Sequence, residues 1–543
     1  MKTKIFLGCM MTASLLTVSC ADLLQEDPQG KLTPENYFST QEELNMSVYS
    51  LYSKVNASQT RTNPQYPQWQ GDDITTNPGS NKQAAAEIDR FAPVNSNKGV
   101  KDCWADHYAI IKAANFIILN ASKTPTDETS MKQAIGQAKF WRAYAYFTLV
   151  RIFGDIPLTL DNENDDFTMT PSPVEKVYEQ IVADLTSEEC ESLPESYKDA
   201  PAFMNGVNVY VTKAALQSTR AAVYMAMAGW PLEKGASYYA KAAEEAKKVI
   251  EGAQNGTYDI RMDDNYYDVY AMSNNYNKET ILGINYSPNV DWVQDSQLTS
   301  CNQFESIGGW GDAWGEIRFW KRFPEGPRKD AIYDPQILKP NKDGKGYELH
   351  DWYEKSGEGW VFPECHPMFS VFSVNWDPAS KANIDAPYDY TLPASQNMCN
   401  GHRHRLIRYA EVKLWYAEAA ARAGEADLTL ARQCLKDVRK RGMVGDTYGN
   451  KKKTYADDGS WKVINGVDID QMNASQLAEA AFEEHGWEVA GYWVALVTRR
   501  ADQFRMKLLQ KTFEERVEVS GTWSDSKVYM PYPDTDSAKN PNL

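Results

Sequence analysis

Tryptophan is concentrated in one stretch of this chain that lacks helical periodicity. Seven of the 16 tryptophans lie between residues 292 and 376, and Trp310 and Trp314 stand next to a glycine-rich turn. Trp69 has a similar setting in an earlier loop, just before Asp72. A tryptophan ring offers a flat apolar face and a polar edge, which suits stacking on a sugar ring, while a carboxylate can accept hydroxyl hydrogen bonds. The predicted sugar-binding residues are Trp69, Asp72, Trp292, Trp310 and Trp314.

Each of these rings could instead pack inside its own lobe, and for a single tryptophan the two interpretations are about equally good. Trp104, Trp141 and Trp415 fall within helical stripes, and we assign them to the core. We expect a ligand to lie across loops 60–80 and 285–320, with Trp292 at the rim.

The sequence contains no recognisable set of catalytic residues. Carboxylates are abundant, so an acid and base pair of the glycosidase type is not excluded by counting. However, no carboxylate pair is flanked by strands, and the sequence contains no nucleophile elbow, HExxH motif or phosphate loop. The sequence therefore predicts a binding protein without a cofactor.

Metal ligation is undecided. The only histidine cluster, at 402–405, is predicted to be a solvated basic turn that opens a helix. The acidic pairs Asp72-Asp73 and Asp263-Asp264 could bind calcium, although such isolated pairs usually face solvent.

Composition limits the classes of partner. The chain has 543 residues, 42% of them hydrophobic, and its formal charge of −17 argues against nucleic acid and anionic membrane surfaces as partners. Six of the eight cysteines follow residue 100, and their spacing does not match that of a metal-binding motif. The sequence does not decide whether they are free thiols or form disulfides.

The first 33 residues are typical of a targeting segment. Lys2 and Lys4 precede an apolar stretch, 5–18, that is too short to span a bilayer. The stretch ends in a lipobox-like run at Cys20, which predicts a signal peptide over 1–19, acylation of Cys20 and a tether over 20–33. The alternative is an ordinary secretory signal with a chance cysteine.

Helices must position these loops. The run 137–153 carries apolar stripes on two sides, so it must pack between other helices, and Gly154 and Pro157 end it. Capping boxes are predicted at Thr40–Glu43 and at Ser172–Glu175. Further helices are expected at about 101–122, 174–185, 212–228, 237–251, 405–423 and 426–441, a strand at 280–286, and an irregular loop over 58–100.

The run around 137–157 resembles the most characteristic helix of the SusD/RagB family, surface glycan-binding lipoproteins of Bacteroidetes-type bacteria. The segments starting at Thr212 and Arg408 and the FPEGPR run at 323–328 are also similar to family motifs, whereas Glu484–Val489 matches only half of the family's C-terminal signature. The matching residues of the first run are Ala138, Arg142, Ala143, Tyr144, Tyr146, Phe147, Val150, Arg151, Gly154, Asp155 and Pro157.

The resemblance implies a mainly α fold, in which tetratricopeptide-like helix pairs pack against an irregular, loop-rich lobe at about 253–400 within a single domain over 34–543. It further implies a non-catalytic, lipid-anchored outer-membrane protein that binds glycan and delivers it to a SusC-like TonB-dependent transporter. A peptide- or protein-binding RagB-like protein is the alternative, and a lipoprotein glycosidase is a third.

Overall fold

The computed structural model describes residues 37–161, 168–200, 202–286, 296–333, 336–343, 346–372, 401–447, 452–516 and 521–543. The predicted signal peptide, Cys20 and the tether lie outside these ranges. Across the described residues, no helix combines the length and apolarity needed to span a bilayer.

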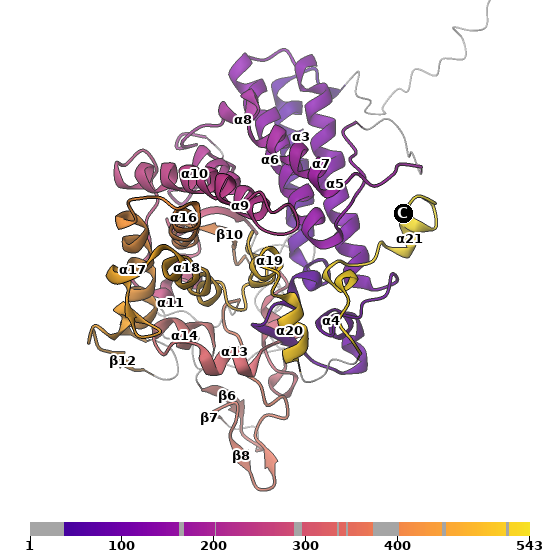
Figure 1. Ribbon diagram of the computed structural model, residues 1–543. Coiled ribbons are helices and arrows are strands. Elements are labelled where there is room, and N and C mark those ends of the chain that lie inside the picture. The colour runs from indigo at the N-terminus through magenta and orange to yellow at the C-terminus, as the bar shows by residue number, and fades with distance from the viewer. Residues whose placement is uncertain are drawn as a thin grey trace, which may run out of the picture.

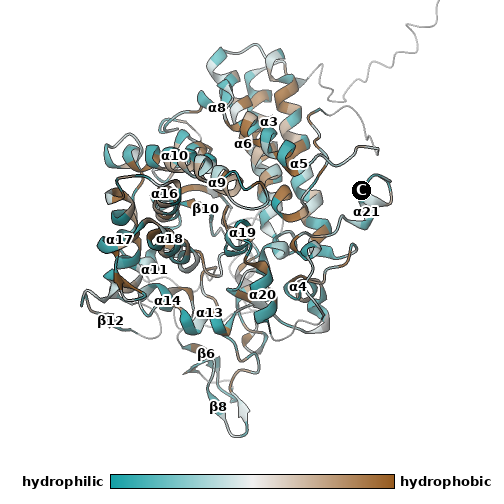
Figure 2. Ribbon diagram, viewed as in Figure 1, coloured by the Kyte–Doolittle hydropathy of each residue, from teal (hydrophilic) through white to brown (hydrophobic). Residues whose placement is uncertain are grey.

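Four helices form the N-terminal bundle in Figure 1: α3 (Gln41–Thr60), α5 (Lys98–Asn120), α6 (Glu128–Phe153) and α7 (Val174–Leu185). The long helix predicted to be covered on two sides is α6, and its residues from Ala134 onward are almost all buried. It ends at Gly154, whose φ of 77° favours glycine, as predicted. Figure 2 shows hydrophobic residues gathered along the helices of this bundle.

The second group of helices consists of α9 (Lys213–Ala228), α10 (Ala236–Gln254), α16 (Tyr409–Ala423), α17 (Thr429–Met443) and α18 (Ala474–Glu488). Alanines such as Ala215, Ala243 and Ala420 are buried at the helix contacts, where small side chains let backbones approach closely. The structure therefore confirms the predicted mainly α class of paired helices beside a loop-rich lobe.

Short helices and two-stranded ladders complete the molecule. The helices are η1 (Asn63–Gln70), α4 (Gln83–Asp89), α8 (Glu188–Glu191), α11 (Tyr266–Tyr270), α12 (Thr299–Asn302), α13 (Ile317–Arg322), α14 (Pro327–Ile332), α19 (Arg499–Arg505), α20 (Leu509–Glu515) and α21 (Asp534–Ser537). The antiparallel strand pairs are β1 (Ile74–Thr76) with β5 (Ala313–Gly315), β4 (Thr280–Ile284) with β10 (His404–Arg408), β6 (Ile337–Pro340) with β7 (Tyr347–His350), and β8 (Lys355–Ser356) with β9 (Gly359–Trp360). Smaller pairs are β2 (Phe203–Met204) with β3 (Val207–Asn208), β11 (Gly445–Asp446) with β12 (Thr454–Tyr455), and β13 (Val463–Ile464) with β14 (Val467–Asp468).

Two local predictions are confirmed and one is wrong. Thr40 caps α3 by accepting a hydrogen bond from the amide of Glu43, as its capping box predicts. Trp104, Trp141 and Trp415 are buried as expected. The second capping box does not form, because Ser172 makes a backbone bridge with Ile156 and the Asp155 carboxylate takes the amide of Val174 instead.

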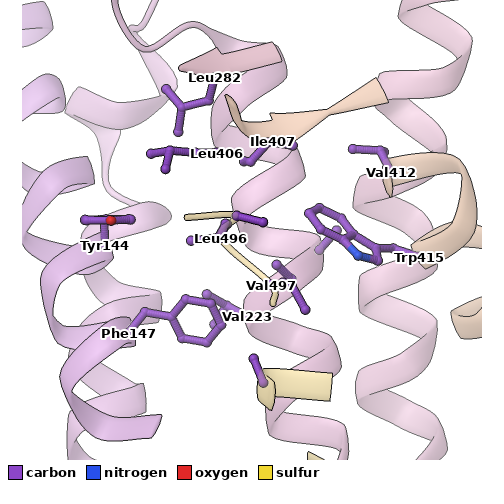
Figure 3. Packing of buried hydrophobic residues seen from close by; sticks show 14 of the residues in the cluster. Tyr144, Phe147, Val223, Leu282, Leu406, Ile407, Val412, Trp415, Leu496 and Val497 are labelled. Carbon is purple, nitrogen blue, oxygen red and sulfur yellow. The ribbon is translucent and has the colours of Figure 1, made fainter. Parts of the chain in front are cut away.

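One hydrophobic core joins segments from most of the described chain, and its buried residues range from Phe38 to Met530. Figure 3 shows side chains from α6 (Tyr144, Phe147), β10 (Leu406, Ile407), α16 (Trp415) and the segment before α19 (Leu496, Val497) lying together in it. A second, smaller cluster with Phe304, Trp314 and Phe362 lies in the loop-rich lobe.

Three of the family-like motifs meet in a buried network of charges. Arg328 of the FPEGPR run bonds to Glu484 at 2.6 Å and to Glu488 at 2.9 Å. Arg408, at the start of another motif, bonds to Glu488 at 2.6 Å, and Arg441 pairs with it at 2.5 Å. Burial raises the pKa of Glu488, but these guanidinium groups outweigh it and lower that pKa to about 2. The half of the C-terminal signature that the chain keeps thus supplies the carboxylates of this network.

Candidate functional site

The two loops predicted to hold a ligand lie side by side. Strand β1 pairs with β5 so that Thr75 stands opposite Trp314, and the amide of Glu316 donates a 3.0 Å hydrogen bond to the carbonyl of Asp73. The two loops are therefore adjacent, but the predicted site residues that they carry lie in different environments.

Trp69 does not present a stacking face. Its ring has 0% exposure and makes edge-on contacts with Tyr66 and with Trp493 at centroid distances of 4.7 and 5.0 Å. Because helix η1 buries the ring against a segment far away in the sequence, this tryptophan belongs to the core, and we withdraw it from the site.

The carboxylate of Asp72 is bound by two arginines. Its carboxylate accepts hydrogen bonds of 2.8 and 3.2 Å from Arg499 and also pairs with Arg322. The side chain is 10% exposed. The expected role as an acceptor for sugar hydroxyls is therefore not supported, since the lone pairs of this carboxylate already accept from the buried Arg499 and the partly exposed Arg322.

The three other predicted tryptophans fall in three settings. Trp314 is 6% exposed and stacks on His366, with ring centroids 4.9 Å apart, so it supports the lobe from inside. Trp310 is half-buried at the edge of the main core and keeps part of its ring accessible. Trp292 lies outside the described residues.

A different set of rings is exposed on the same lobe. Tyr353 is 49% exposed and Trp360 is 47% exposed, which are high values for large aromatic side chains. Trp320 lies beside Tyr353, with its ring centroid 6.4 Å from that of Tyr353 and 5.3 Å from that of Trp352. We call the exposed rings of Tyr353 and Trp360, together with the half-buried Trp320 and the buried Trp352 beside Tyr353, the aromatic lobe surface.

The sequence folds locally to display these rings. Strands β8 and β9 pair Lys355 with Trp360 around a turn in which Gly357 has a φ of 63°. The ammonium of Lys355 lies 5.1 Å from the centre of the Trp360 ring. Figure 1 shows this hairpin at the end of the molecule that lies farthest from the N-terminal bundle.

The base of this surface is rigid because the small core of the lobe supports it. Trp352 is 7% exposed and belongs to that core together with Phe362, and Trp320 packs against it. The ammonium of Lys329 lies 4.3 Å from the centre of the Trp320 ring. Trp352 and Trp360 belong to the tryptophan-rich stretch but are not among the residues predicted from sequence to bind sugar. The glycine turn at 357–359 was the local signal for a protruding ring.

A cavity with a charged lining lies elsewhere. It has a volume of about 680 Å³ beside α17, and five basic and four acidic side chains line it. Three of its lysines are paired with carboxylates, Lys413 with Asp437 at 2.5 Å, Lys436 with Asp470 at 2.8 Å and Lys440 with Asp457 at 2.8 Å. Its one ring, Trp461, is covered by lysine ammonium groups. These charges satisfy each other, so we do not choose this cavity as the site.

The histidine cluster is not a solvated turn, and this prediction is wrong. His404 lies in β10, and His402 just before it; both are almost completely buried. The nitrogen Nε2 of His402 is 2.9 Å from the carbonyl oxygen of Tyr270. Burial, with Arg405 nearby, lowers the pKa of His402 to about 3. Among the described residues, no group of three or more His, Cys, Asp or Glu side chains could hold a metal ion.

The cysteines that the structure describes are free thiols, namely Cys103, Cys190, Cys301, Cys365 and Cys434. Cys399 lies outside the described residues.

Known proteins share both the sequence pattern and the fold. A family model described as starch-binding and associating with the outer membrane matches residues 22–225, and the SusD family model matches residues 388–543. SusD-like protein P2 of Formosa agariphila is 29% identical, over 97% of this chain and 96% of its own length.

Solved structures agree with these matches. A SusD homolog from Bacteroides thetaiotaomicron superposes with a TM-score of 0.72 at 19% identity, covering 94% of this chain and 97% of its own. Surface glycan-binding protein A from Bacteroides fluxus gives a TM-score of 0.67 at 19% identity, with coverages of 92% and 97%. The paired helices and the aromatic lobe therefore define a protein of the SusD superfamily fold. The chain belongs to the SusD/RagB family.

Proposed function

We propose that this protein is a non-catalytic glycan-binding lipoprotein of the cell surface, and that the aromatic lobe surface supplies its stacking faces. The observation that carries the proposal is the exposure of Tyr353 and Trp360 on a lobe that has its own hydrophobic core. Exposed rings offer flat apolar faces, and sugar rings bind to such faces through their C–H groups.

The position of the surface supports the choice of ligand. Tyr353 and Trp360 lie on a protruding lobe instead of in a closed cavity, so a long polymer can cross them without threading into the protein. One relative of similar fold is named a surface glycan-binding protein, which favours the same class of ligand here.

Binding should be tested by affinity electrophoresis and calorimetry of the purified protein against a panel of plant, algal and host polysaccharides. We expect Trp360→Ala and Tyr353→Ala each to weaken binding of the selected polysaccharide about three- to tenfold, as for loss of one aromatic contact. Leu349→Ala is the matched control, because Leu349 is an exposed apolar residue (40%) in the same lobe.

Three outcomes would contradict this proposal. Unchanged polysaccharide binding by a variant that combines Trp360→Ala with Tyr353→Ala would place the site elsewhere. Release of shortened oligosaccharides by the purified protein would make it a glycosidase. Binding of peptides by a protein that binds no polysaccharide in the panel would favour the RagB-like alternative.

Anchoring and delivery form the second half of the proposal. Acylation of Cys20 would tether the protein to the outer membrane, where it would pass glycan to a SusC-like TonB-dependent transporter. The outer-membrane description of the family matched over residues 22–225 supports this location. Metabolic labelling with a fatty-acid analogue should mark the wild type and not Cys20→Ala, and equal labelling of both would refute the anchor. Co-purification of the transporter with the tagged protein would test delivery.

A further inference from the structure

A pocket with an unusual lining lies on the N-terminal bundle. It has a volume of about 180 Å³ between α3, α6 and the segment 197–210. None of its twelve lining residues is charged, although charged residues make up 24% of the chain. Tyrosine rings and side-chain amides dominate the lining, and we call this cavity the tyrosine–amide pocket.

The innermost polar group of the pocket has a fixed orientation. Gln137 lies against Val211, whose amide donates to Oε1 at 3.3 Å and whose carbonyl accepts from Nε2 at 3.1 Å. Only one orientation of the Gln137 amide satisfies both backbone groups. In that orientation Nε2 also donates to the hydroxyl oxygen of Tyr197. Because this oxygen accepts, the hydrogen of the Tyr197 hydroxyl points away from Gln137.

That hydroxyl therefore keeps a hydrogen to donate, and Tyr197 is one of the residues that line the pocket. Among the described residues, no acceptor pairs with the hydroxyl hydrogen of Tyr197. Burial raises the pKa of Tyr197, so the hydroxyl stays protonated and keeps its hydrogen. The Tyr197 backbone is held by a 2.5 Å hydrogen bond from its amide to Oδ1 of Asn208 beside the β2–β3 hairpin.

Aromatic and amide groups form the rim. Tyr49 is 41% exposed, and its ring centroid lies 6.4 Å from that of Tyr210. The Tyr210 ring is backed by Tyr52, which stacks on it at 4.5 Å. Asn45 accepts from Gln41 through Oδ1 at 2.9 Å, which leaves its Nδ2 hydrogens available at the rim.

The lining selects a class of ligand. A charged ligand would lose hydration here without gaining a counter-charge, so the pocket disfavours it. The volume is below the roughly 300–1,000 Å³ of sites for drug-sized ligands, so it admits a single ring and not an oligosaccharide. We propose that the tyrosine–amide pocket is a second binding site that takes one uncharged sugar ring. The choice of a sugar rests on the proposed function, but the pocket does not share residues with the aromatic lobe surface. Figure 1 shows α3 and α6, which carry most of its lining, at the other end of the molecule from β8.

Saturation-transfer NMR on the intact protein can test this site. The probes are glucose, galactose, mannose, xylose and N-acetylglucosamine, with glucuronic acid as the charged counterpart. We expect at least one neutral sugar to bind and glucuronic acid to bind at least tenfold more weakly. Tyr197→Phe, which keeps the ring and removes the donor, should weaken the neutral sugar about three- to tenfold.

Two further variants separate a binding role from a structural one. Ala200→Phe should fill the pocket and abolish the signal while leaving the polar lining in place, whereas Tyr238→Phe removes a tyrosine hydroxyl of α10 outside the pocket and should change nothing. The inference is overturned if no neutral sugar of the panel binds, if glucuronic acid binds as well as glucose, or if Tyr197→Phe and Ala200→Phe both bind as the wild type does.

Failure of this inference and failure of the proposed function give different results. Trp360→Ala should leave monosaccharide binding unchanged, and Tyr197→Phe should leave polysaccharide binding at the lobe within twofold. If Trp360→Ala has no effect on polysaccharide binding while Tyr197→Phe still weakens the monosaccharide, only the lobe proposal fails. The reverse pattern refutes only the pocket.

Discussion

Asp72 accepts a 2.8 Å hydrogen bond from Nε of Arg499, which is 427 residues further along the chain. Arg322 of α13 pairs with the same carboxylate. Burial raises the pKa of Asp72, but the two arginines outweigh burial, so that pKa is lowered overall. The contact ties the first loop to the lobe and to the C-terminal helices, and it gives Asp72 a structural role.

Replacing this carboxylate should destabilise the fold without affecting glycan binding. We expect Asp72→Asn to lower the free energy of unfolding at pH 7 by roughly 3 kcal/mol, because the buried Arg499 loses the charge of its nearest carboxylate. Since the pKa of Asp72 is lowered in the folded state, this stabilisation exists above about pH 3.9, the pKa of a free aspartate, and is lost as pH falls below it. Urea unfolding at pH 7 and pH 3 measures both effects, with exposed Asp264→Asn as the control. Weaker glycan binding by a fully stable Asp72→Asn would return Asp72 to the site.

The neighbouring aspartate should show the opposite sign. Burial first, and the charge of Asp72 to a smaller extent, raise the pKa of Asp73 to about 6, although its carboxylate accepts a 2.8 Å hydrogen bond from the amide of Gly491. The unfolded state therefore ionises before the folded state, and stability falls as pH rises from about 4 to 6.

Asp73→Asn keeps an acceptor for Gly491 and removes the buried charge. We expect it to raise the free energy of unfolding at pH 7 by on the order of 1–3 kcal/mol and to have little effect at pH 3.5. Denaturant titrations across this pH range are the measurement. A loss of stability at pH 7 would show that the charge of Asp73 is needed.

Two tryptophans with similar sequence surroundings should differ in their effect on stability. Trp69→Ala should cost about 3–5 kcal/mol, because it removes a ring packed against Trp493 and leaves a cavity. Trp360→Ala should change stability by less than about 0.5 kcal/mol, because that ring is 47% exposed. Thermal unfolding of both variants checks this pair, and equal losses would mean that the hairpin is packed more tightly than described.

Cleavage of the hairpin should not release a domain. A specific protease sequence inserted after Gly357 lies in an exposed turn, so it should be cut readily. We expect the two fragments to stay together on size exclusion, because β1 pairs with β5 and the main core includes residues on both sides of the lobe. Separation of a folded fragment would contradict the predicted single domain over 34–543. The sequence predicts an irregular, accessible loop over 58–100, but η1 and α4 form within this stretch and many of their residues are buried.

Local sequence determined most of the helical architecture. The two apolar stripes of α6 and the stop at Gly154 depend on neighbours within a few turns, as does the capping of α3 by Thr40, so periodicity and capping chemistry were sufficient to predict them. The burial of Trp141 and Trp415 followed in the same way from the apolar stripes of their own helices, α6 and α16.

Only the tertiary structure decided which rings and charges reach solvent. Trp69 and Trp360 both lie near glycine in loops, yet Trp493 covers the first and the second stays exposed, because burial depends on segments distant in sequence. In the same way, the sequence predicts a solvated turn for the basic run before α16. In the structure this run forms β10, which pairs with β4, and Glu488 neutralises Arg408. Such long-range contacts have no signature in local spacing, which is why the class of fold could be predicted and the binding surface could not.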